Sequence, residues 1–482
     1  MIIQTGKSGL NTDVAPALLP PDALTAGDSF TCVAGSVSGS RMRRRLFAID
    51  IEPLFHYEWQ NVDGEQKYLV SNVLSVYLYN QDGTYSDITP STPFTDGAKL
   101  DFTDLNTVLV VNSDLDGLYY YDNTRLVPAP GWPSSMRAKS IAAIKYNLVA
   151  MNLTDNGEKF PSKLMWSKSA EEGGMPNVWT PALDNDAGDD ILGESEAEIL
   201  GAVQYRDMLW IVKADSIYRM AWVGGQYVYT IKRQTGLIEI GYPEAFCGCR
   251  NNLAIFSTDD VMLFDGTFLD TKALNRVSGA IRASSESGAF GRVQLLYAPS
   301  DKLLLLGLGA PNSNVITKVF GYSLIDDTWS VFNVGFCYGL GLTSGFISGS
   351  REIIFYTEIE AGGANYQIEV ATDYYDPQFD NEYILQQTSA ERTGIPLNEV
   401  MMVTKALPRI RGVPVTITIG TQETQDSPVK WGLPKTVQPG QETFVPVMRS
   451  GRFLAYTIAA ESKQRWSCDA LDVRANPMGD KA

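Results

Sequence analysis

The stretch MLWIVKADSIYRM, residues 208–220, decides the fold: two short apolar runs are separated by the polar turn at 213–215. The same pattern returns in LAIFSTDDVMLF, residues 253–264. Short runs rich in Ile, Val and aromatic residues, bounded by polar turns, are typical of antiparallel strands. A hairpin with apolar residues on both faces is not stable alone. We therefore expect it to pack between neighbours of the same kind.

Comparable hairpins recur along most of the chain. They lie at residues 76–88, 108–121, 144–166, 303–324 and 353–370. Repeats of roughly 40 to 60 residues, each with three or four short strands, indicate a β-propeller, because each blade covers the faces of its neighbours and closure of the ring removes the exposed ends. We expect a propeller over residues 46–385, with six blades favoured and seven as the alternative.

The two ends of the chain differ from this repeat. Residues 1–45 hold a Pro-bounded apolar strip at 18–20 and a Gly/Ser-rich stretch at 35–40, which predict an extended N-terminal arm. Residues 386–482 hold an alternating strand at 413–419 and two further strands, 453–458 and 466–473, interpreted as a hairpin. The fold class we predict is all-β: an arm, a propeller and a C-terminal β-sandwich.

The charge balance is acidic. The 482 residues include 56 Asp and Glu against 39 Lys and Arg, which gives a net charge of −17 and a pI near 4.6. Proteins that grip phosphates usually have basic surfaces, so the composition disfavours a tight nucleic-acid binder. Two interpretations stay open: an ordinary acidic protein, or one that lets DNA pass without adhering to it.

Several common sites have little support in the composition. The five cysteines are odd in number and scattered, so they imply no disulfide framework, and Cys247 and Cys249 are interpreted as core residues. With His56 as the sole histidine, sites built on several histidines are excluded, and we expect no metal and no cofactor. No apolar run is long enough for a transmembrane helix, and residues 1–40 lack the pattern of a signal peptide. We expect a protein kept or assembled in a cytosol.

One dense basic cluster occurs, at Arg41, Arg43, Arg44 and Arg45. Guanidinium groups pair well with carboxylates, so the cluster is a candidate for docking to a neighbouring subunit or another partner. A solvated turn before the first strand and a contact with DNA are the other two interpretations.

One dense acidic cluster also occurs, and no basic residue interrupts it. Its members are Asp184, Asp186, Asp189, Asp190, Glu194, Glu196 and Glu198. Hard cations such as calcium bind clusters of oxygen atoms, but Ser195 stands where an EF-hand loop starting at Asp184 would need its final Glu. The interpretations are a solvated acidic loop, a cation contact, or part of the lining of a lumen.

Enzymatic propellers are the main alternative class. The turn QDGTY at 81–85 is loosely similar to a sialidase Asp-box, but the flanking Ser and Trp are missing and the other blades do not repeat it. A glycoside hydrolase would need a carboxylate pair, and no particular pair is indicated. We expect a protein that is not an enzyme.

Several short motifs together resemble a known family. They are the strip at 18–20 with the Arg-rich start of the first strand, EILGAV at 198–203 with the 208–220 hairpin, FSTDDVMLFDG at 256–266, and GRF at 451–453 with Trp466. This pattern is similar to the tail-nozzle proteins of short-tailed bacteriophages, also called packaged-DNA stabilisation or head-completion proteins.

The resemblance implies a non-enzymatic virion protein of the tail, assembled in the cytoplasm of a bacterial host. Such proteins form a homo-hexameric ring below the portal and its adaptor, extend the DNA channel, and help to retain and then eject the genome. They also contact tail fibre, spike or needle proteins, while double-stranded DNA passes through the lumen without specific binding. A β-propeller scaffold or glycan-binding protein is the alternative, and a propeller glycoside hydrolase is the second alternative.

Overall fold

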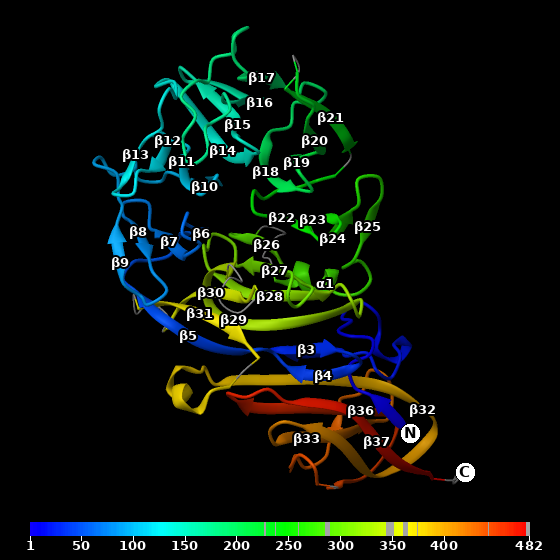
Figure 1. Cartoon of the computed structure of the whole chain (residues 1–482). Helices are drawn as coiled ribbons and strands as arrows, with labels where there is room; N and C mark the ends of the chain where they lie inside the picture. Colours follow the sequence, from blue (N-terminus) through cyan, green and yellow to red (C-terminus); the bar gives the residue numbers. More distant parts are fainter. Residues whose placement is uncertain are drawn as a thin grey trace.

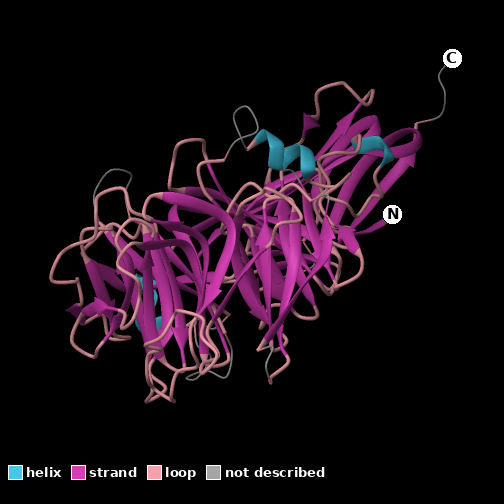
Figure 2. Cartoon of the chain, turned by 90° about the horizontal axis from the view of Figure 1, so that it is seen from above, coloured by secondary structure: helices cyan, strands magenta, loops and turns pink. Residues whose placement is uncertain are grey.

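A computed structural model describes residues 1–225, 228–236, 238–258, 260–284, 290–343, 351–359, 365–373, 375–441 and 443–478. Strands make up almost all of its regular structure (Figure 2). The helical segments are short: η1 (Pro16–Leu18), α1 (Ser278–Ala283) and η2 (Pro377–Glu382). The predicted all-β class is confirmed.

Five blades are separate four-stranded antiparallel sheets whose strands follow one another in chain order (Figure 1). Blade 1 contains β6 (Phe55–Gln60), β7 (Gln66–Ser71), β8 (Val76–Tyr79) and β9 (Tyr85–Asp87). Blade 2 contains β10 (Leu100–Leu105), β11 (Val108–Ser113), β12 (Gly117–Tyr121) and β13 (Leu126–Pro128). Blade 3 contains β14 (Met136–Ile144), β15 (Asn147–Asp155), β16 (Glu158–Trp166) and β17 (Gly188–Ile191).

Blades 4 and 5 contain the two hairpins predicted at residues 208–220 and 253–264. Blade 4 is built from β18 (Ile199–Tyr205), β19 (Met208–Lys213), β20 (Ser216–Trp222) and β21 (Tyr229–Gly236). Blade 5 is built from β22 (Phe246–Cys249), β23 (Asn252–Ser257), β24 (Asp260–Phe264) and β25 (Leu269–Thr271). β19 pairs with β20, and β23 pairs with β24, both antiparallel, so the two predicted hairpins are confirmed.

Strand β19 shows why a blade needs neighbours on both sides. Leu209 and Ile211 are buried in the cluster shared with blade 3, whereas Trp210 and Val212 are buried in the large core that includes blade 5. Successive side chains of a strand point to opposite faces, so an apolar run without alternation requires cover on each face.

The last two blades share one long strand, β29 (Thr328–Leu342). Its first part pairs with β28 (Ile316–Ser323) and completes blade 6 with β26 (Val293–Ala298) and β27 (Leu303–Gly309). Its second part begins blade 7, which continues with β30 (Ile353–Glu358), β31 (Tyr366–Thr372) and the N-terminal strand β5 (Met42–Ile49). The start of the chain therefore supplies the outer strand of the last blade.

The ring closes over seven blades in the described part of the chain. The innermost strands contact one another in the cyclic order β6, β10, β14, β18, β22, β26, β29 and back to β6. The structure thus has the alternative number of blades, seven, rather than the favoured six. β29 serves two blades and β5 comes from the other end of the sequence, so the last blade does not have the repeat of the others.

Strands β32 to β37, here called the C-terminal unit, form the other body. They are β32 (Gln386–Arg411), β33 (Val415–Gln422), β34 (Lys430–Trp431), β35 (Lys435–Val437), β36 (Val445–Ser462) and β37 (Ser467–Pro477). β32 pairs with β36 along much of its length and also with β37. The predicted hairpin between 453–458 and 466–473 is wrong, because the long β32 pairs with both of these strands.

The first forty residues join the two bodies. β1 (Ile2–Gln4) pairs with β37, and β2 (Ala26–Asp28) pairs with β32. The hairpin of β3 (Phe30–Val33) and β4 (Ser36–Gly39) bridges them, since Phe30 pairs with Val331 of β29 and Ser38 pairs with Ser467 of β37. The predicted arm is thus part of the sheet structure, and its predicted end at residue 45 lies inside β5.

Candidate functional site: the arginine junction and the charged surfaces

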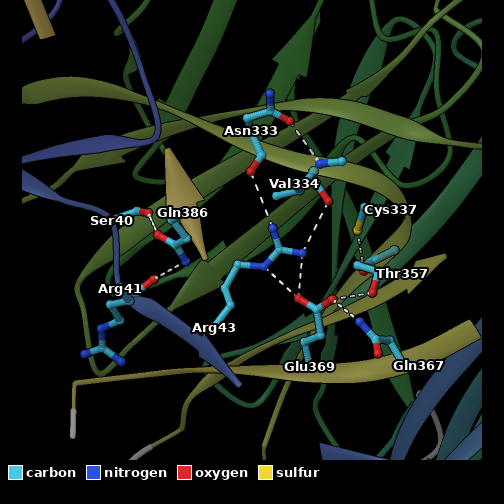
Figure 3. Close-up of polar contacts among 12 residues, drawn as sticks. Ser40, Arg41, Arg43, Asn333, Val334, Cys337, Thr357, Gln367, Glu369 and Gln386 are labelled. Atoms are coloured by element: carbon cyan, nitrogen blue, oxygen red, sulfur yellow. Dashed lines mark hydrogen bonds and ion pairs between the residues drawn. The ribbon is translucent and has the colours of Figure 1, made fainter. Parts of the chain in front are cut away.

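The basic cluster lies where blade 7, blade 6 and the C-terminal unit meet. Arg43 leaves β5 and reaches Glu369 of β31, with Nε to Oε2 at 2.7 Å and Nη2 to Oε2 at 2.6 Å (Figure 3). The same guanidinium donates to the carbonyl oxygens of Asn333 and Val334 in β29, at 3.5 and 3.3 Å. Arg43 therefore links the first and last strands of blade 7.

The Glu369 carboxylate is almost fully buried, with 2% of the residue exposed. Its second oxygen accepts hydrogen bonds from Thr357 Oγ1 at 2.5 Å and Gln367 Nε2 at 2.7 Å. A buried ion pair is stable only when its remaining hydrogen-bonding capacity is satisfied in this way. The ring of Phe355, 5.0 Å from the Arg43 guanidinium carbon, covers the cation.

Arg41 connects the propeller to the C-terminal unit. Its guanidinium contacts Asp301 of blade 6 and lies 3.1 Å from Asp373, which also pairs with Arg465 at 2.7 Å. Its backbone carbonyl accepts a hydrogen bond from Gln386 Nε2 at 2.9 Å. Burial raises the pKa of Asp301, although Arg41 opposes this shift.

The other two arginines of the cluster are more loosely held. Arg44 Nε is 4.0 Å from Glu382, and its guanidinium carbon lies 5.3 Å from the centre of the Phe379 ring. Arg45 is exposed, with no ion-pair partner among the described residues. Of the three interpretations of the cluster, the contacts of Arg41 and Arg43 match guanidinium–carboxylate docking, but the carboxylates belong to the same chain.

An apolar cavity lies beside this junction, between β3 and the faces of blades 6 and 7. Its volume is about 140 Å³, and its wall includes Leu303, Leu305, Val319, Phe332 and Phe355. Arg41, Arg43 and Arg465 also line it. A cavity of this size and character accommodates a small apolar group.

The acidic cluster lies around β17, the outer strand of blade 3, and most of its members have local partners. Asp189 pairs with Lys163 at 2.8 Å, Glu194 with Arg233 at 3.3 Å, and Glu198 with Lys139 at 2.6 Å. Burial opposes the shift, but hydrogen bonds from Ser169 lower the net pKa of Asp186. Asp184, Asp190 and Glu196 are exposed, with no ion-pair partner among the described residues.

The cation held by this loop is a lysine of the chain itself. Lys213 is buried and donates to the carbonyl oxygens of Leu192 and Ser195, both at 2.8 Å, and to Ser162 Oγ at 3.2 Å. Desolvation lowers the pKa of Lys213. Across the described ranges, no three His, Cys, Asp or Glu side chains are grouped closely enough to hold a metal ion. The cation contact of the acidic cluster stays a prediction.

A polar cluster of His56, Tyr356 and Glu58 was not predicted from the sequence. His56 lies between blades 1 and 7, stacked on Tyr356 with ring centres 4.2 Å apart, and Tyr356 donates to Glu58 Oε1 at 2.7 Å. The imidazole occupies the place where a side chain at Gly339 would stand, so that glycine is required. Burial, followed by the charge of Glu58, raises the pKa of Tyr356. Only ring closure brings the two ends of this cluster together, so no local motif could have predicted it.

The charges are divided unevenly between the two bodies. Residues 46–385 contain 44 Asp and Glu against 22 Lys and Arg, a net charge of −22. Residues 386–482 contain 9 Asp and Glu against 12 Lys and Arg, a net charge of +3. Residues 1–45 contain 3 Asp and Glu against 5 Lys and Arg, a net charge of +2. The chain thus combines a strongly acidic propeller with a weakly basic remainder.

No known protein-family model matches the chain, and no curated protein sequence matches it. Solved structures similar to it include virginiamycin B lyase from Staphylococcus aureus, at 10% identity and a TM-score of 0.43 over 68% of this chain and 99% of that one. A streptogramin B lyase is 11% identical, with a TM-score of 0.42 over 68% of this chain and 96% of that one. YCF48 bound to a D1 peptide is 12% identical, with a TM-score of 0.39 over 75% of this chain and 99% of that one. These similarities concern the β-propeller fold alone. Within the described residues, no helix has the length and apolar character needed to cross a membrane.

Proposed function

We propose that this protein is a structural scaffold that acts through its surfaces, and more specifically a tail-nozzle subunit of a short-tailed bacteriophage. One observation carries the scaffold proposal. The N-terminal strands pair with β29, β31, β32 and β37, so backbone hydrogen bonds join the propeller to the C-terminal unit. Ion pairs of Arg41 and Arg465 reinforce the same seam. Such a body holds its outer surfaces at fixed positions.

Two observations support the nozzle as the particular scaffold. The motifs that resemble the nozzle family occur along the chain from the N-terminal strip to Trp466. The propeller also has a net charge of −22, and a ring of acidic propellers would repel DNA phosphates instead of releasing their counterions. DNA would then slide past the ring without binding to it.

The test is the assembly state of the purified full-length chain. Mass photometry and electron microscopy should show a six-fold ring, alone or with a purified portal adaptor. The same preparation should not retard double-stranded DNA at moderate salt. A chain that stays monomeric in both settings, or that binds DNA tightly, would contradict the nozzle proposal.

Glycan binding is the second candidate, favoured by an exposed aromatic patch. Trp222 and Tyr146 are 51% and 52% exposed, and Lys145 Nζ lies 3.9 Å from the centre of the Trp222 ring. Tyr and Trp are enriched at binding surfaces, because their rings combine an apolar body with a polar group. A glycan array with the wild-type chain and Trp222→Ala tests it: binding lost in the variant supports this candidate, and an array without signal rejects it.

A further inference from the structure

One face of the C-terminal unit carries a surplus of positive charge, although Asp472 lies on it as well, 4.0 Å from the terminal amino group of Met1. In the pairing of β32 with β37, Lys405 stands directly opposite Arg474, and Arg409 lies farther along β32, opposite Ala470. Ala406, Pro408, Ile410 and Val473 alternate with these residues and are buried, so the basic side chains share the outer face. We call Lys405, Arg409 and Arg474 the basic face.

This arrangement is unfavourable in an isolated molecule. Like charges directly opposite each other destabilise an antiparallel pair. Among the described residues, neither Arg409 nor Arg474 has an ion-pair partner, and Lys405 lies over the ring of Phe444, 4.0 Å from its centre. An acidic surface placed against this face would relieve the repulsion.

The chain itself has a complementary surface on blade 3. Asp184, Asp190 and Glu196 are exposed around β17, together with Leu183, which is fully exposed, and Ile191, which is 60% exposed. We call these five residues the acidic rim. The acidic rim thus offers a partner both exposed carboxylates and exposed apolar side chains.

The two surfaces of one molecule cannot meet. Figure 1 shows β17 at the top of the propeller and the C-terminal unit at the bottom of the view. A contact between the basic face and the acidic rim therefore needs two copies. Because different surfaces of each copy are used, the contact repeats from copy to copy and gives a ring when the rotation closes.

We propose that the basic face of one copy binds the acidic rim of the next, and that this contact builds the ring. The inference rests on the proposed function, since it supplies the interface which that function requires. Complementary charges at the edge of an interface steer association and select the partner. The contact should therefore weaken as salt is raised, because exposed charges are screened.

A charge swap tests the proposal. The face variant is Arg409→Glu/Arg474→Glu, and the rim variant is Asp184→Lys/Asp190→Lys/Glu196→Lys. Each alone juxtaposes like charges and should raise the dissociation constant of assembly at least about tenfold. An equimolar mixture restores opposite charges at every contact of an alternating ring, so mass photometry should show assembly recovered.

The control for the face variant is Lys302→Glu/Lys318→Glu, which makes the same change in net charge as the face variant at two exposed lysines of blade 6. It should assemble like the wild type, and thermal unfolding should show that all variants are folded. If the folded variants assemble normally, or if mixing does not restore their assembly, the proposed contact between the basic face and the acidic rim is wrong. The proposed ring would then have to form through another interface. If the wild type itself forms no assembly, the proposed function fails.

Discussion

The propeller and the C-terminal unit are both antiparallel β-structure, yet they are held together differently. In blades 1 to 5, each strand pairs with the next one in the sequence, and carboxylates such as Asp82 and Asp122 lie in turns with local hydrogen bonds. In the C-terminal unit, β32 pairs with β36 and β37, which lie far along the chain. Because blades 1 to 5 are held by local strand pairing, many of their surface positions can be occupied by acidic residues. The two bodies are joined by the N-terminal strands, and ion pairs of Arg41 and Arg465 with Asp373 reinforce this junction.

The largest expected effect is at the ring closure. Glu369→Ala leaves the Arg43 guanidinium without its buried partner, and the loss of one member of such a pair costs about 3–5 kcal/mol. Denaturant unfolding should show this decrease in the free energy of unfolding. The double variant Arg43→Met/Glu369→Leu should recover part of the loss. A change of Glu369 alone that leaves stability intact would show that β5 does not depend on this pair.

The second-largest effect on stability is expected where residues 16–20 of the N-terminal segment contact the C-terminal unit. Arg392 is buried, and its Nη2 donates to the carbonyl oxygens of Pro16, Leu19 and Pro20 at 3.0, 3.0 and 3.2 Å. Arg392→Met removes these three hydrogen bonds. The carbonyl of Leu19 then has no other donor among the described residues, whereas the carbonyls of Pro16 and Pro20 still accept from the backbone N–H groups of Leu19 and Ala23. The buried Leu19 acceptor left without a partner should cost about 1–3 kcal/mol.

Limited proteolysis should then cut the Arg392→Met variant near residues 16–20 sooner than the wild type. The neighbouring exposed Glu399→Gln should leave the cleavage rate unchanged. Equal rates in Arg392→Met and the wild type would mean that other contacts hold the arm.

Acid should affect the propeller before the C-terminal unit. Hydrogen bonds from the backbone of Arg125 and Thr124 lower the pKa of Asp122, and backbone hydrogen bonds from Phe268 and Thr267 lower the pKa of Asp265. A group whose folded pKa lies below its unfolded value contributes stability above that unfolded value, and the contribution is lost as the pH falls through the folded pKa.

For these aspartates the unfolded value is near 3.8, so the loss begins as the pH falls below about 4. In the C-terminal unit, by contrast, the shifts oppose each other, because a hydrogen bond from Lys430 lowers the pKa of Glu423 and burial raises the pKa of Glu391. Hydrogen exchange at decreasing pH should show amides of the blade turns exchanging first. Simultaneous exchange of β32 and β36 would contradict this difference.

The smallest effect is expected at the exposed end of the basic cluster. Arg45→Ala should change the free energy of unfolding by no more than about 0.5 kcal/mol, as is usual for surface substitutions. Arg44→Ala should cost slightly more, because Arg44 also covers the Phe379 ring. Denaturant unfolding of both variants beside Glu369→Ala would rank the positions. A large loss at Arg45 would indicate a partner outside the described residues.

Local patterns were enough to predict most of the blades. The apolar runs at 208–220 and 253–264 predicted hairpins, and both are present as β19–β20 and β23–β24. In the C-terminal unit, the strands β33, β36 and β37 were predicted. The long β32 was not, so its pairing with β36 and β37 was missed. Arg43 was predicted to dock to another subunit or partner, but it pairs with Glu369 of its own chain, and Glu369 carries no signal in its own neighbourhood.

By itself, the sequence determined the all-β class, the repeated hairpins and the overall acidity, since these depend on neighbouring residues and on composition. Only the tertiary structure decided the seven-blade ring, the ion pairs of Arg41 and Arg43, and the contact of His56 with Tyr356. Each of these joins residues from opposite ends of the propeller. Such contacts form only when the whole ring closes, so no local rule of pairing or propensity specifies them.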